Sequence, residues 1–144
     1  MKKIANTFFK MLLAIVLLLG CQNITKEKSE SNDASYEEKL SLNKGEKWEA
    51  NEATTVGIEN MIAAINSTDS NSLNPKVLAE KLDSEFKTIV AKCTMTGEAH
   101  DQLHYFILPL KDKIEILKNS NYKNGQTQLK EIKLYLKSYK KYFK

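Results

Sequence analysis

Residues 100–117 read HDQLHYFILPLKDKIEIL and carry the clearest helical periodicity in this chain of 144 residues. The members of one face recur at spacings of three, four, three, four and three residues: His100, Leu103, Ile107, Leu110, Ile114 and Leu117. Alternating spacings of three and four are typical of a helix that packs along the seam of a bundle. Pro109 lies inside the repeat, and we expect a kink there because its ring displaces the carbonyl four residues earlier. The pattern predicts a helix from about residue 98 to residue 118.

A second helix precedes this stretch and begins at Asn74 and Pro75. The Asn side chain can accept a hydrogen bond from a free amide of the first turn, and proline at the first helical position has no amide to leave unpaired. Its apolar stripe consists of Leu78, Leu82, Phe86, Ile89 and Cys93. Gly97 is expected to end this helix, since glycine is the usual residue just past a helix C-terminus.

Two further segments have the same spacing. The first runs from about residue 49 to residue 66, and Trp48 extends its face by one heptad; that face consists of Thr55, Ile58, Ile62 and Ile65. The last runs from residue 128 to residue 143, with a face of Leu129, Ile132, Leu136, Tyr139 and Phe143. Before it, residues 119–127 contain the turn signal Asn124-Gly125 and are expected to form a loop.

The four predicted helices are joined by short connections, and alternating β patterns are scarce. Short connections favour antiparallel neighbours in a helical protein. We therefore predict an all-α fold, an antiparallel up-down-up-down four-helix bundle over residues 44–144.

The N-terminal segment has a different character. Lys2, Lys3 and Lys10 make it positively charged, and an uninterrupted apolar run follows over residues 11–19. Nine residues are far fewer than the ~20 that a membrane-spanning helix needs. A positive leader followed by a short apolar run is typical of a signal peptide.

The end of this segment, Leu18-Leu19-Gly20-Cys21, resembles the lipobox of bacterial lipoproteins. The resemblance implies that residues 1–20 are a signal peptide that is removed, and that Cys21 becomes the first residue, thioether-linked to diacylglycerol and acylated, as with palmitate, on its amino group. It places the protein at the membrane, lipid-anchored in the bacterial cell envelope. An ordinary secretory signal with an incidental cysteine is the alternative. Residues 21–43 contain few large apolar side chains, so we expect a lipidated flexible tether there.

The charge of the chain changes once residues 1–20 are set aside. The whole chain has a net charge of +4, but those residues contain three lysines and no acid, which leaves 19 Lys against 18 Asp and Glu, or +1. With no strongly basic balance and no recognised motif, nucleic acid is not an expected partner. Residues 123–144 nevertheless carry seven lysines and one acid. Such a basic C-terminal helix suits an anionic partner or headgroup surface, although a solvated face is the commoner interpretation.

The candidate site lies in residues 92–104, which read KCTMTGEAHDQLH and contain both histidines of the chain and its only cysteine besides Cys21. His100 and His104 are four residues apart, so on a helix their rings share one face and can meet a single ion. Gly97 allows a turn that brings Cys93 back towards them. Thiolate, thioether and two imidazoles are soft donors that suit Cu(I), with Zn(II) as the other option through Cys93 and both histidines. The candidate metal ligands are Cys93, Met95, His100 and His104.

This segment, Cys-x-Met-x-Gly-x-x-His-x-x-x-His, is similar to one in small bacterial lipoproteins with a helical domain. The similarity covers about a dozen residues and the lipobox, and it implies neither an activity nor a ligand. The alternative is a packing role, in which Cys93 continues an apolar stripe, Met95 fills a gap and His100 occupies the seam.

Sequence motifs of enzymes are absent. There is no Gly-rich phosphate loop, no Gly-x-Ser-x-Gly and no His-Glu-x-x-His, so no catalytic residue is predicted. A thiol enzyme using Cys93 with His100 is the remaining enzymatic option. We expect a non-enzymatic, lipid-anchored envelope protein that binds copper or zinc at the bend between the second and third helices. The alternative is a structural or adaptor lipoprotein that contacts an envelope protein or the membrane through its basic C-terminal helix, with no metal.

Overall fold

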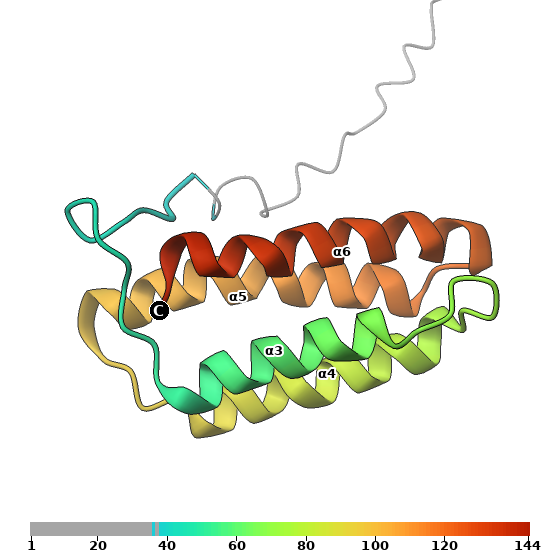
Figure 1. Ribbon diagram of the computed structural model, residues 1–144, viewed down its shortest axis with the longest axis horizontal. Helices are drawn as coiled ribbons and strands as arrows, with labels where there is room; N and C mark the ends of the chain where they lie inside the picture. Colours follow the sequence, from blue (N-terminus) through green and yellow to red (C-terminus); the bar gives the residue numbers. More distant parts are fainter. Residues whose placement is uncertain (1–35, 37) are drawn as a thin grey trace, which may run out of the picture.

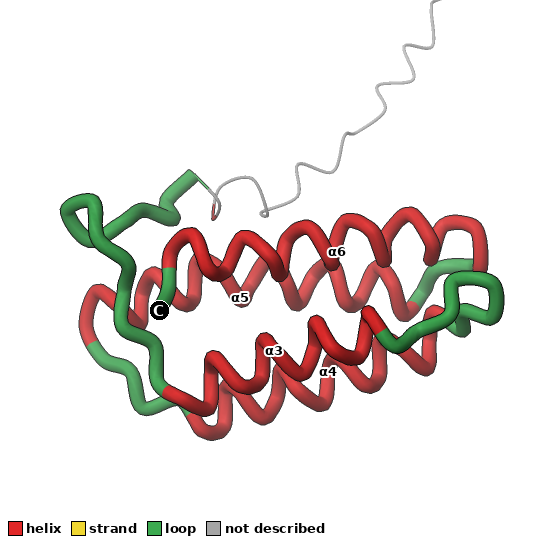
Figure 2. The backbone as a smooth tube through the Cα atoms, in the orientation of Figure 1, coloured by secondary structure: helices red, strands yellow, loops and turns green. Residues whose placement is uncertain are grey.

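The computed structural model describes residue 36 and residues 38–144. It contains four helices in this range, listed in chain order: α3 (Glu52–Asn66), α4 (Pro75–Lys92), α5 (Gly97–Lys118) and α6 (Tyr122–Tyr142). Each helix packs against the next and α6 returns to α3, which makes the predicted antiparallel bundle (Figure 1). Figure 2 shows only helix and loop in the described part of the chain. The all-α prediction is confirmed, whereas the predicted signal peptide, Cys21 and most of the tether lie outside the described residues.

A single hydrophobic core fills the space between the helices. The predicted seam of α5 is its centre, since every apolar seam residue from Leu103 to Leu117 is at most 4% exposed. The predicted stripe of α6 is also buried, from Leu129 to Phe143. Pro109 is buried inside α5, which continues unbroken through it to Lys118.

The buried face of α3 differs from the predicted one. Thr54 and Met61 are fully buried, while Thr55 and Ile62 are only half-buried. The physical reason is Gly57, at which α3 approaches α4 closely: a Cβ atom there would lie 2.4 Å from Ile89 Cγ1. The close approach buries the side of α3 that carries Thr54 and Met61, in addition to Ile58 and Ile65 of the predicted face, which are 1% and 3% exposed.

The predicted loop at residues 119–127 is wrong, because α6 begins at Tyr122. Asn121 caps the helix, and its side chain accepts a hydrogen bond from the Asn124 amide at 2.9 Å. Gly125 is therefore inside the helix, where it allows a close approach: a Cβ atom would lie 2.5 Å from Pro75 Cγ. The Asn124-Gly125 pair therefore lies in the first turns of α6, where Asn121 is the cap and Gly125 serves packing, rather than forming a turn.

The first helix also starts later than predicted, at Glu52, and Trp48 is not on it. Residues 48–50 instead pair with residues 142–144, and we call this pairing the clasp. The Trp48 amide donates to the Tyr142 carbonyl at 2.8 Å, the Lys144 amide to the Trp48 carbonyl at 3.0 Å, and the Ala50 amide to the Lys144 carbonyl at 2.9 Å. The clasp joins the two ends of the bundle domain.

The last residues assigned to the tether are held on the bundle by Gln102 of α5. The Ser41 amide donates to Gln102 Oε1 at 2.8 Å, and Gln102 Nε2 donates to the Lys39 carbonyl at 3.5 Å. Trp48 Nε1 donates to the Ser41 carbonyl at 2.7 Å, and Leu40 packs against the core. Contacts with the bundle therefore extend to residues 39–41, before the predicted start of the bundle domain at position 44.

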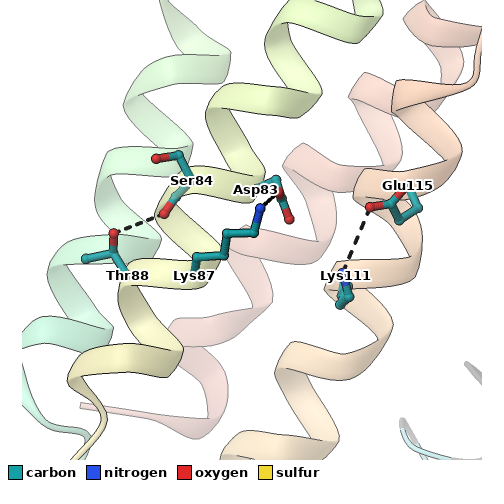
Figure 3. Close-up of polar contacts among 6 residues, drawn as sticks. All are labelled: Asp83, Ser84, Lys87, Thr88, Lys111 and Glu115. Carbon is teal, nitrogen blue, oxygen red and sulfur yellow. Dashed lines mark hydrogen bonds and ion pairs between the residues drawn. The ribbon is translucent and has the colours of Figure 1, made fainter.

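The outer surface of α4 and α5 carries polar contacts one helical turn apart (Figure 3). Lys87 Nζ lies 2.6 Å from an Asp83 carboxylate oxygen, and Lys111 Nζ lies 3.9 Å from Glu115. The hydrogen bond from Lys87 lowers the pKa of the Asp83 carboxyl and raises the pKa of the Lys87 ammonium. Contacts at this spacing give modest support to a solvated helix face.

Candidate metal centre

The bend between α4 and α5 brings the predicted ligands to one end of the bundle. Cys93 caps the C-terminus of α4 with an extended backbone, at φ −67° and ψ 123°. Gly97 has φ +62°, a left-handed conformation that glycine adopts without steric cost, and α5 begins there. The sequence suggested that Gly97 would end the second helix. It starts the third helix instead, since α4 already ends at Lys92. The bend, the C-terminus and the loop leading into α3 lie at the same end of the molecule (Figure 1).

Three of the four predicted ligands lie in a continuous chain of contacts. Cys93 Sγ is 3.6 Å from His100 Nδ1, and His100 Nε2 is 2.9 Å from His104 Nε2. The two imidazole rings meet edge to face, with centroids 4.5 Å apart and an interplanar angle of 65°. His100 therefore has a partner at both of its ring nitrogens.

The proton positions in this chain follow from the donor and acceptor rules. A neutral imidazole has one N–H and one bare nitrogen. In one arrangement His104 Nε2 donates to His100 Nε2, and His100 Nδ1 donates to the Cys93 sulfur. In the other, the Cys93 thiol donates to His100 Nδ1, and His100 Nε2 donates to His104. Both arrangements satisfy every contact with neutral groups.

Exposure differs along the chain of contacts. Cys93 and His100 are half-buried, whereas His104 is exposed. Cys93 and Met95 both pack against the hydrophobic core. No hydrogen bond among the described residues joins the Met95 sulfur to either imidazole. The structure thus brings Cys93, His100 and His104 together and places Met95 beside the core.

The contacts around His100 point in opposite directions. Cys93 approaches one edge of the imidazole ring and His104 approaches the other. Within residues 36 and 38–144, no group of three or more His, Cys, Asp or Glu side chains is arranged to hold one metal ion. The arrangement offers instead a pair of imidazole nitrogens with a thiol behind it.

Two residues that the sequence did not single out fix segments next to the site. Asn51, at the N-terminus of α3, donates from Nδ2 to the Lys92 carbonyl at 3.1 Å, directly before Cys93. Gln102, only 5% exposed, lies in the turn of α5 between the two histidines and binds residues 39 and 41. The only sequence signal for the role of Gln102 was a polar residue next to the apolar seam. For Asn51 the only signal was the preference of asparagine for helix N-termini.

The basic helix α6 is a second candidate surface. Lys140 pairs with Glu59 at 3.6 Å and Lys144 with Glu49 at 3.0 Å, both across to the α3 side. Lys130, Lys133 and Lys137 make no ion pair with any described residue. A groove of about 240 Å³ lies between α6 and α3, and Lys137 is the one of these three lysines that lines it; its lining is Thr55, Ile58, Glu59, Ile62, Leu136, Lys137, Tyr139 and Lys140.

The Tyr139 hydroxyl lies at the α3–α6 contact, 3.0 Å from Thr55 Oγ1. Burial is the main cause that raises the pKa of Tyr139, and the hydrogen bond with Thr55 partly offsets it. The Tyr139 side chain is therefore a neutral, fixed part of the contact between α3 and α6.

None of the described helices is both long and apolar enough to cross a bilayer. Comparisons with protein-family models, curated proteins and solved structures find no match to this chain. The interpretation of the site therefore depends on its own geometry and chemistry.

Proposed function

We propose that this chain is a non-enzymatic, lipid-anchored protein of the bacterial cell envelope that binds a soft transition-metal ion, Cu(I) or Zn(II), at the bend between α4 and α5. The observation that carries the metal proposal is the chain of contacts from Cys93 through His100 to His104. The lipid anchor rests on the lipobox-like sequence ending at Cys21.

The donor types support a soft ion. Imidazole nitrogen binds copper and zinc, whereas hard ions such as Mg²⁺ or Ca²⁺ prefer oxygen ligands. The exposed ring of His104 leaves a path for the ion from solvent, while the half-buried ring of His100 is held by Cys93. A soft ion with access from solvent suits a binding role rather than a buried structural role.

The direct test is metal titration of residues 22–144, a fragment that contains all the described residues. We expect one tightly bound ion per chain in competition with a Cu(I) or Zn(II) chelator. Binding should be lost in the double variant His100→Ala/His104→Ala. Asp101→Ala is the matched control, since Asp101 is exposed on the same turn and should leave binding unchanged. Absence of binding at micromolar metal would rule out the proposal.

An adaptor role for α6 is the second candidate. Lys130, Lys133 and Lys137, which make no ion pair with any described residue, follow one another at helical spacing along α6, and Lys137 lines the groove between α3 and α6. Such a row favours an anionic surface, either an envelope protein or lipid headgroups.

Charge reversal of those three lysines to glutamate tests the adaptor role. We expect reduced recovery of partners from envelope extracts, or reduced flotation with anionic vesicles. Reversal of Lys44, Lys76 and Lys92, which are exposed elsewhere, is the matched control. Equal loss in both triple variants would mean that only net charge matters, and would contradict a docking role for α6.

A further inference from the structure

We infer that the bound ion is Cu(I), that it lies between the Nε2 atoms of His100 and His104, and that Cys93 stays outside the coordination shell as the hydrogen-bond partner that orients His100. This inference rests on the proposed metal-binding function and specifies its ligands.

The first step concerns the two nitrogens of the His100 ring. Nδ1 faces Cys93 Sγ at 3.6 Å, and Nε2 faces His104 Nε2 at 2.9 Å. Because these nitrogens lie on opposite edges of one ring, an ion held by Nε2 is out of reach of the Cys93 sulfur. A histidine ligand commonly donates its other ring N–H to a nearby acceptor, which fixes the tautomer and the ring orientation. The Cys93 sulfur is in the place of that acceptor.

The second step concerns the protons. An ion between the two Nε2 atoms requires both of them to be bare, so each neutral ring keeps its single N–H at Nδ1. For His100 that N–H then points at Cys93. This is one of the two proton arrangements that the metal-free contacts already permit, so His100 needs no rotation to bind. His104 only has to move its proton from Nε2 to Nδ1.

The third step concerns distance. With metal–nitrogen bonds of about 2.0 Å, two nitrogens on one ion lie about 3.3 Å apart in a tetrahedral site and about 4 Å apart in a linear one. The observed 2.9 Å must therefore open by about 0.4 to 1.1 Å. His104 is exposed and can swing outward, while His100 is held by Cys93 and by its position against the bundle.

The fourth step concerns the choice of metal. Zn(II) in structural sites takes four ligands, and the described residues present no third or fourth His, Cys, Asp or Glu at this point. Cu(I), in contrast, is stable with only two nitrogen donors in a near-linear arrangement. Two converging imidazoles therefore favour Cu(I) over Zn(II).

The experiment measures Cu(I) affinity and the reactivity of the Cys93 thiol in the same samples of residues 22–144, kept anaerobic with ascorbate. We expect iodoacetamide to alkylate Cys93 at a rate that Cu(I) changes by less than about twofold, and no ultraviolet copper–thiolate band. Cys93→Ser retains an acceptor and should keep the affinity nearly unchanged. Cys93→Ala should lower it about 10- to 100-fold, the usual effect of losing an outer-shell partner.

His104→Ala should abolish tight Cu(I) binding, and because His104 is exposed this variant should keep its helical circular dichroism. Protection of Cys93 from alkylation by Cu(I), or unchanged affinity in His104→Ala, would overturn the inference and leave the proposed function standing. Tighter binding of Zn(II) than of Cu(I) would overturn the choice of metal. If neither Cu(I) nor Zn(II) binds, the result would instead contradict the proposed function itself.

Discussion

Gly57 decides how closely α3 and α4 approach. A Cβ atom at this position would lie 2.4 Å from Ile89 Cγ1 and 2.9 Å from Ile89 Cδ1. Ile89 is fully buried, so it has little room to move aside. The small residue therefore sets the spacing of the two helices.

We predict that Gly57→Ala lowers the free energy of unfolding by up to about 2 kcal/mol. Overpacking a core costs about 1–3 kcal/mol, from which the better helix propensity of alanine subtracts about 1 kcal/mol. In an Ile89→Ala background, where both crowding atoms are gone, the same substitution should be stabilising by up to about 1 kcal/mol. Urea denaturation followed by circular dichroism measures both. An equal loss in the two backgrounds would show that contact with Ile89 is not the cause.

Among the elements, α6 and the clasp at its end close the bundle. Phe143 is 1% exposed and stacks on Tyr139 with ring centroids 5.0 Å apart, while Phe106 of α5 meets it edge to face at 6.0 Å. The clasp adds backbone hydrogen bonds between residues 48–50 and residues 142–144. This end of the bundle therefore depends on the last residues of the chain as much as on helix packing.

We predict that deletion of Lys144 speeds amide hydrogen exchange at Ala50, because its carbonyl accepts the Ala50 amide hydrogen bond. Exchange in the middle of α3 should not change, since local opening can occur without unfolding the helix. Lys144→Ala is the control: it keeps the backbone bonds and removes only the exposed ion pair with Glu49. Equal acceleration in the deletion and in Lys144→Ala would indicate that the ion pair, and not the clasp, protects Ala50.

At the scale of the whole molecule, one core connects all four helices and the segment before them. Trp48, the only tryptophan of the chain, is 6% exposed and belongs to the same buried cluster as the seams of α5 and α6. Since small domains with one core usually unfold in a single cooperative step, the two ends should not unfold separately.

We therefore predict that urea unfolding curves from Trp48 fluorescence and from helical circular dichroism coincide in midpoint and slope. Each probe reports a different part: Trp48 reports the clasp end and circular dichroism reports the helices. A fluorescence transition at lower urea than the loss of helix would contradict this prediction. It would mean that residues 38–51 and the clasp form a separate, weaker unit.

The helices and their number follow from local rules that the sequence states directly. The seam from Leu103 to Leu117 and the start of α4 at Asn74 and Pro75 were predictable, because periodic burial and helix capping act within one helix. The i,i+4 meeting of His100 and His104 was predictable for the same reason. The N-terminal features up to Cys21 remain an interpretation of sequence, outside the described residues.

Contacts between elements were decided by the tertiary structure alone. The close approach of α3 to α4 depends on Gly57 meeting Ile89, and the long α6 depends on Gly125 fitting against Pro75, which are close approaches between different helices. The pairing of Trp48 with the C-terminus and the placement of Cys93 at one edge of the His100 ring likewise join separate segments. The sequence by itself determined four amphipathic helices and a cluster of soft donors, since their periods and capping residues are local. Which nitrogen faces the thiol and which faces the second histidine required the packed bundle, because a turn at Gly97 and a tie from Asn51 to Lys92 set that geometry.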